Sequence, residues 1–105
     1  MHARVVTFEG VDVDRAEGLP QEATDRLRTI LEGMEGWQGM LQLIDRDTRT
    51  QMLVHLFDSE ENALAAETTF EDMPNEVPAV REVAARRSSV GHYDVSFGVI
   101  GGQEL

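Results

Sequence analysis

The chain of 105 residues contains no cysteine and no lysine. The absence of thiols excludes disulfides, thiolate nucleophiles, cysteine-ligated zinc and iron–sulfur clusters. The absence of lysine excludes Schiff-base chemistry and a phosphate-binding P-loop. All nine cationic residues are arginines, and they are outnumbered by 20 acidic residues, which gives a net charge of −11. We therefore expect no nucleic-acid partner and no anionic membrane partner.

Long apolar runs and aromatic residues are also scarce. Aromatic residues make up 6% of the chain, and no segment approaches the ~18 apolar residues that a transmembrane helix needs. The first residues lack the apolar region of a signal peptide, so we expect a cytoplasmic protein. The length suits a single domain, residues 1–105, with one modest hydrophobic core. A domain of this size gains stability by self-association.

Two apolar segments, residues 37–44 and 51–57, flank the polar connector 45–50 and predict a β-hairpin. Strict alternation places Trp37 on one face of its strand with Gly39, Leu41 and Leu43. Large apolar side chains occur on both faces of both strands. A sheet with one face in water shows polar residues at alternate positions instead. We therefore expect helices of this chain to cover one face and a second subunit to cover the other.

The remaining segments predict one further strand at each end of the chain, with helices between them. The first part of the chain is expected to form a strand at 2–9, a loop of about ten residues from Gly10 and a helix at 20–34. After the hairpin, we expect a helix from Asp58 or Ser59 to about Glu71, where Pro74 and Pro78 break the pattern, and then a short helix at 77–87. A strand at 89–100 and a frayed tail complete the chain. This order predicts an α+β, ferredoxin-like split β-α-β antiparallel sheet of spatial order 4-1-3-2, with helices on one face. Two such sheets packed face to face form a dimeric α+β barrel.

Two short motifs carry a family resemblance. Gly36-Trp37-Gln38-Gly39-Met40 precedes the hairpin, and Leu56-Phe57-Asp58-Ser59-Glu60-Glu61 leads from it into a helix. This arrangement resembles the antibiotic-biosynthesis-monooxygenase-like family, although Glu35 stands where proline is frequent and Phe57 where tryptophan is frequent. The resemblance implies a ferredoxin-like dimeric α+β barrel. The family includes cofactor-free quinone-forming monooxygenases, haem-degrading oxygenases and many small proteins of no established activity.

The resemblance does not extend to haem or metal binding. Haem-degrading members use a histidine on a helix, whereas all three histidines here fall on predicted strands, so we expect no cofactor. A site built from His2, His55 and His92 would need all three rings around one ion. A strand at 89–100 would place His92 opposite the far end of the first strand, about 15–20 Å from His2. We therefore expect no metal.

Five residues are candidate contacts for a small molecule between the helices and the sheet: Trp37, His55, Phe57, Phe70 and His92. His55 and Arg4 are the candidate catalytic groups. Each also has a structural interpretation. Trp37 would close the end of the core, His55 would be a hydrogen-bonded core residue, and Arg4 would pair with an acidic residue across the dimer interface.

These observations favour a small homodimeric barrel protein with a helix–sheet pocket for an apolar or aromatic molecule. One alternative is a cofactor-independent monooxygenase acting on a phenolic or polyketide-like substrate. There Trp37, His55 and Arg4 would position the substrate and stabilise an enolate-like anion. The other alternative is a structural or regulatory dimer without a ligand. No motif decides whether the protein is an enzyme.

Overall fold

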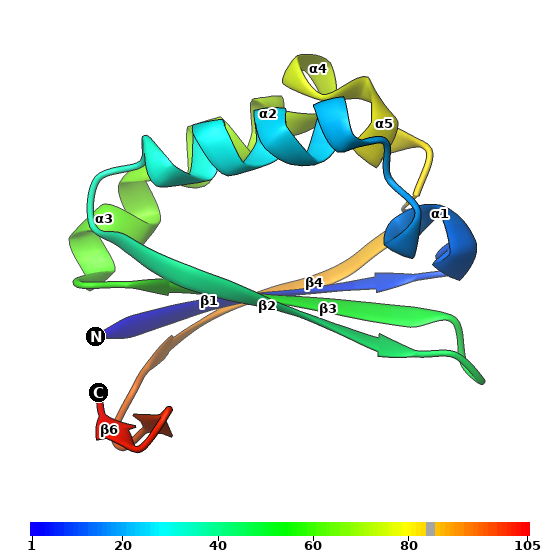
Figure 1. Ribbon diagram of the computed structural model, residues 1–105. Helices are drawn as coiled ribbons and strands as arrows, with labels where there is room; N and C mark the ends of the chain where they lie inside the picture. Colours follow the sequence, from blue (N-terminus) through cyan, green and yellow to red (C-terminus); the bar gives the residue numbers. More distant parts are fainter. Residues whose placement is uncertain (84–85) are drawn as a thin grey trace.

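Four antiparallel strands form the sheet of the computed structural model, which describes residues 1–83 and 86–105. They are β1 (His2–Glu9), β2 (Trp37–Asp45), β3 (Thr50–Phe57) and β4 (Arg86–Asp94). Their spatial order is β2-β3-β1-β4, which is the predicted order. The longer helices all lie on one side of this sheet, whereas the C-terminal residues lie on the other (Figure 1). The predicted α+β, ferredoxin-like fold is confirmed.

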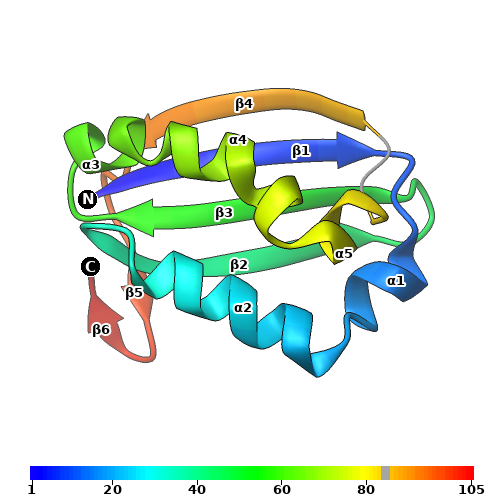
Figure 2. The same cartoon turned by 90° about the horizontal axis from the view of Figure 1, so that it is seen from above.

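Residues 1–83 and 86–105 also contain five helices. They are α1 (Val13–Glu17), α2 (Gln21–Glu32), α3 (Glu60–Ala65), α4 (Glu67–Glu76) and α5 (Pro78–Arg81). Of these, α2 and α4 run across one face of the sheet (Figure 2). Helix α2 agrees with its prediction to within two residues at each end. Within residues 1–83 and 86–105, every helix is too short or too polar to cross a membrane.

Three predicted helical boundaries were wrong. The expected loop after β1 contains α1, because the Asp12 side chain accepts a hydrogen bond from the backbone N–H of Arg15 and caps a helical turn. Pro74 lies inside α4 rather than ending it. The short helix predicted at 77–87 is α5, which ends at Arg81; residues 84–85 of that prediction lie outside the described residues.

The last strand was also wrongly bounded. We expected it at residues 89–100, but β4 begins at Arg86 and ends at Asp94. The tail expected to fray forms a small hairpin, β5 (Val99–Ile100) with β6 (Gln103–Glu104). Its turn uses Gly101 and Gly102, both at positive φ. The first residues of β4 are polar and lack the apolar pattern of a strand, so their strand conformation is evident only from their pairing with β1.

A bulge in β2 reverses the predicted orientation of Trp37. Trp37 pairs with Phe57, but the next pair is Gly39 with Leu56, so Gln38 is an extra residue. An extra residue moves everything before it to the other face of the strand. Trp37 therefore shares the helix-covered face with Met40 and not, as strict alternation predicted, the opposite face with Leu41.

The entry to β2 depends on Gly36. This residue has a φ of 76°, and a Cβ atom placed on it would lie 2.2 Å from the Asp58 carboxylate. The Gly36 carbonyl also accepts a 2.8 Å hydrogen bond from the backbone N–H of Asp58. Glycine at this position thus lets the start of β2 approach the end of β3, which brings Trp37 over the neighbouring strand.

Candidate functional site

A cavity of about 660 Å³ lies between the helices and the sheet. Its volume falls within the range of small-molecule sites. The sheet contributes Arg4, Val6, Leu53 and His55 to the wall, and α2, α4 and α5 contribute Leu27, Leu31, Phe70, Met73 and Val80. The wall is mainly apolar, and its polar side chains include the histidine and the arginine that the sequence nominated.

Cross-strand pairing brings the polar groups together. Arg4 pairs with His55 of β3 on one side and with His92 of β4 on the other. Residues that pair directly across strands project from the same face. All three side chains therefore stand in one row beneath α4, where Phe70 packs against two of them. Its ring lies 4.0 Å from the Arg4 guanidinium carbon and 4.6 Å from the His55 ring.

Trp37 determines the tautomer of His55. The indole Nε1 of Trp37 lies 3.2 Å from His55 Nδ1. An indole N–H can only donate, so Nδ1 must accept, and the proton of the neutral imidazole is on Nε2. Burial, with the charge of Arg4 as the second cause, lowers the pKa of His55 from 6.5 to about 4. At neutral pH His55 is thus a fixed, uncharged N–H donor in the cavity wall.

Acidification from about pH 7.5 to about pH 5 should lower the free energy of unfolding by about 2 kcal/mol through His55 alone. The folded state keeps this ring neutral until the pH nears 4. The unfolded chain takes up the proton near pH 6.5, so it binds more protons in this window and becomes favoured. Urea denaturation at a series of pH values measures the effect. His55→Asn retains an acceptor for Trp37 but does not titrate, so its stability should vary less with pH; an unchanged pH dependence would contradict the prediction.

The buried Arg4 side chain is paired within its own chain. Its Nε and Nη2 donate to the two carboxylate oxygens of Glu67 at 2.5 and 3.1 Å. Burial acts to raise the pKa of Glu67, but hydrogen bonds and charge from Arg4 and His92 outweigh it, so this pKa lies below its usual value. The prediction that Arg4 pairs with an acidic residue across a dimer interface was wrong, because Arg4 points toward the helices and pairs with Glu67.

The predicted separation of His2 and His92 was also wrong. Their rings are in contact, with His2 Nε2 3.0 Å from His92 Nδ1. His92 Nε2 is in turn 3.0 Å from Glu67 Oε1. Because β4 ends at Asp94, His92 pairs near the start of β1 rather than near its end. A polar chain therefore extends from the cavity wall at Arg4 through Glu67 and His92 to His2.

The nominated contact residues divide into two groups. Trp37, His55 and Phe70 line the cavity together with Arg4. Phe57 is fully buried in a core cluster with Ala63 and Ala66, and His92 belongs to the polar chain. Glu67 was not among the residues predicted from the sequence. An arginine in the middle of an apolar strand requires an acidic partner, but the strand pattern did not indicate which helical residue supplies it.

Comparison with known proteins bears on the fold. No family model matches the chain, and no curated protein matches it. A protein from Bordetella bronchiseptica proposed to be an antibiotic biosynthesis monooxygenase superimposes with a TM-score of 0.63 and 13% identity, over 89% of this chain and 94% of the other. A similarly described protein from Chloroflexus aurantiacus superimposes with a TM-score of 0.59 and 14% identity, over 97% of this chain and 98% of the other. A third protein of this description, from Nitrosomonas europaea, superimposes with a TM-score of 0.54 and 14% identity, over 88% of this chain and 86% of the other.

The chain has the antibiotic-biosynthesis-monooxygenase-like fold. The resemblance carried by the two short motifs is therefore confirmed at the level of the fold. At 13–14% identity these neighbours show the architecture alone. The function of the chain therefore has to follow from its own cavity and surfaces.

Proposed function

We propose that this chain is a homodimeric α+β barrel protein whose helix–sheet cavity binds an apolar or aromatic molecule bearing a carbonyl or phenolic oxygen. The observation that carries the proposal is the fixed donor at His55. Nε2 of His55 has no hydrogen-bond partner among residues 1–83 and 86–105, and the ring lines the cavity. A single N–H donor in an apolar wall favours a ligand with one matching oxygen acceptor.

Arg4 adds positive charge on the same wall. The guanidinium is held by Glu67 and by the face of Phe70, so its position is fixed before a ligand arrives. A cation beside a neutral donor favours an oxygen that carries partial or full negative charge, as in a phenol or an enolisable ketone. The rest of the ligand would contact Leu27, Leu53 and Met73.

The second subunit is proposed from the sheet face that lacks helices. Its central row contains Leu41, Val54 and Val5, which pair directly across β2, β3 and β1. The adjoining rows contain Leu43 with Met52 and Leu56 with Ala3, and none of these side chains is charged. Leu41 is 53% exposed and Tyr93 58%. An apolar, uncharged face in a chain of net charge −11 favours a second copy as its cover.

The binding proposal is tested with two probes that differ only by a hydroxyl group, 1-naphthol and naphthalene. We expect 1-naphthol to bind about tenfold more tightly, because its oxygen accepts from His55 Nε2. His55→Phe, which keeps a ring of similar size, should remove this preference. The chain has one tryptophan, so the single indole N–H signal in a nitrogen–proton correlation spectrum reports binding beside His55.

A cavity-filling variant is the matched control. Leu53→Phe should weaken both probes, because the larger ring occupies part of the cavity without removing the donor and without adding a second indole signal. The proposal fails if neither probe moves the Trp37 signal, or if His55→Phe weakens both probes equally. Oxygen uptake on addition of anthrone, lost in His55→Phe, would support the second candidate, a cofactor-independent monooxygenase. That candidate is favoured by the same donor and cation, which suit an enolate oxygen.

A further inference from the structure

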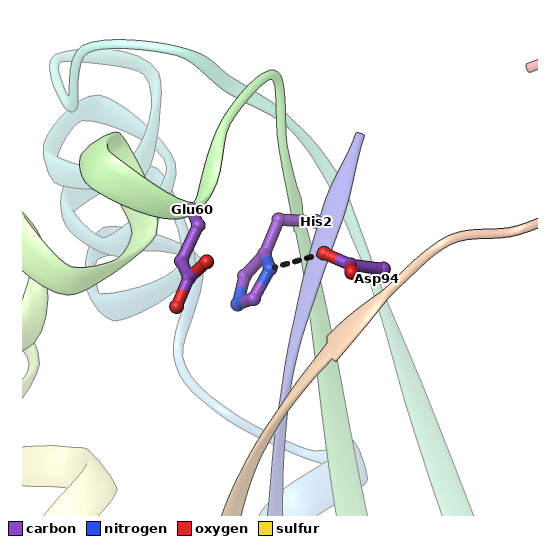
Figure 3. A group of neighbouring side chains, drawn as sticks. All are labelled: His2, Glu60 and Asp94. Carbon is purple, nitrogen blue, oxygen red and sulfur yellow. Dashed lines mark ion pairs between the residues drawn. The ribbon is translucent and has the colours of Figure 1, made fainter.

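The start of β1 carries a cluster that the cavity does not use. His2, Glu60 and Asp94 come from β1, the first turn of α3 and the end of β4, and one potential ligand atom of each lies within 4.8 Å of the others. His2 stands between the two carboxylates (Figure 3). Its side chain is 4% exposed, whereas that of Asp94 is 91% exposed. None of the three lines the cavity.

The buried ring of His2 has an unpaired nitrogen that points into this cluster. Nδ1 is buried and has no hydrogen-bond partner among the described residues. Its nearest acidic atom is Asp94 Oδ1 at 3.6 Å, which is too long for a hydrogen bond. Buried polar atoms are almost always paired, so an unpaired one indicates a partner that the polypeptide does not supply.

The polar chain behind His2 indicates which nitrogen carries the proton. The carboxylate of Glu67, paired with Arg4, can only accept, so His92 Nε2 donates to it. In the neutral ring His92 Nδ1 is then an acceptor, and His2 Nε2 must donate to it across 3.0 Å. This leaves His2 Nδ1 with a lone pair directed toward carboxylates that also only accept. A cation placed between these three groups would pair with all of them.

We propose that His2 Nδ1, Glu60 and Asp94 bind a divalent first-row transition-metal ion such as Zn²⁺. Two ligands bonded at about 2.1 Å in a tetrahedral site lie roughly 3.4 Å apart, close to the 3.6 Å between His2 Nδ1 and Asp94 Oδ1. Glu60 is on the surface and can rotate inward. An imidazole ligand favours such an ion over Mg²⁺ or Ca²⁺, and the exposed side of Asp94 leaves a position for water.

The proposed site has the outer hydrogen bonds typical of metal-binding histidines. A ligating ring usually donates its second N–H to another polar group, which fixes its tautomer and orientation. Here His2 donates to His92, and Glu67 orients His92 in turn. The ion would join three segments, the start of β1, the start of α3 and the end of β4. It would also connect this corner with Arg4 in the cavity wall.

Calorimetric titration of Zn²⁺ into the chain without a polyhistidine tag tests the proposal. We expect saturable binding of one ion per chain. Asp94→Asn and Glu60→Gln should each weaken binding by about tenfold or more. Both side chains are on the surface, so these variants avoid disturbing the buried His2 ring. Glu61→Gln is the matched control, because it removes the same charge from the same helical turn and should bind as the wild type does.

Nitrogen NMR of the imidazole rings identifies the ligand atom. Zn²⁺ should shift the Nδ1 signal of His2 and leave that of His55 in place. The proposal is overturned if the wild-type chain binds no Zn²⁺ saturably, if Glu61→Gln weakens binding as much as Asp94→Asn, or if His2 Nδ1 does not respond. Equal weakening in the two variants would mean that the acidic surface attracts the ion without a defined site.

Discussion

Glu67→Ala should lower the free energy of unfolding by about 3 kcal/mol, because it leaves the guanidinium of Arg4 buried without a counter-charge. The Arg4 side chain is 4% exposed, so water cannot replace the two hydrogen bonds that Glu67 accepts. Glu67 itself is 29% exposed. The reverse change, Arg4→Met, should therefore cost less, since the remaining carboxylate can be hydrated and keeps His92. Urea denaturation of both variants measures this asymmetry.

Two further variants test whether the cost of Glu67→Ala comes from the burial of Arg4: a double substitution of the pair, and the loss of an ion pair on the surface. Arg4→Met with Glu67→Leu should recover stability to within about 1 kcal/mol of the wild type, because apolar pairs replace buried ion pairs well. The matched control is Glu17→Ala, which removes a similarly bidentate partner from the exposed Arg46. Its effect should be far smaller, as for surface ion pairs generally. If Glu67→Ala is no worse than Glu17→Ala, Arg4 is not effectively buried.

The order of strands could be predicted because it depends on features that a sequence displays directly. Segments rich in β-branched and other apolar residues, bounded by polar connectors, located β1 and the β2–β3 hairpin, and short connections left few ways to close the sheet. Strand ends were predicted less well. Arg86 enters β4 through pairing with β1, including its ion pair with Glu9, and not through any local apolar pattern. That shift alone accounts for the error in placing His92.

The sequence predicted several residues of the candidate site, but not which of their side chains contact one another. His55, Trp37 and Arg4 were each nominated as polar or aromatic residues beside apolar strands. Their arrangement depends on the extra residue Gln38, which turns Trp37 toward His55, and periodicity has no signal for a bulge. Glu67 is one of 20 acidic residues. Only the crossing of α4 over β1 distinguishes it from the others.

Leu41→Glu should raise the dissociation constant of the proposed homodimer by about a hundredfold or more, since each interface would then contain two buried, unpaired carboxylates. Leu41 lies at the β2 end of the central apolar row on the helix-free face, beside Val54. A face that a second copy covers cannot hydrate the introduced charge. Sedimentation over a range of protein concentrations should show a dimer for the wild type and a monomer for this variant.

The matched control for the sheet face is Leu64→Glu. Leu64 is 50% exposed, nearly as much as Leu41, and it belongs to α3, a helix on the helix-covered side of the sheet (Figure 1). Its substitution should leave the dimer intact, because the carboxylate remains in water. A wild-type chain that sediments as a monomer at every concentration would contradict the dimer, and equal weakening by both substitutions would show that association does not use the sheet. If only Leu41→Glu dissociates the dimer, the uncharged rows of β1, β2 and β3 form the interface, and the cavity on the other face of the sheet remains open to ligand in the assembled protein.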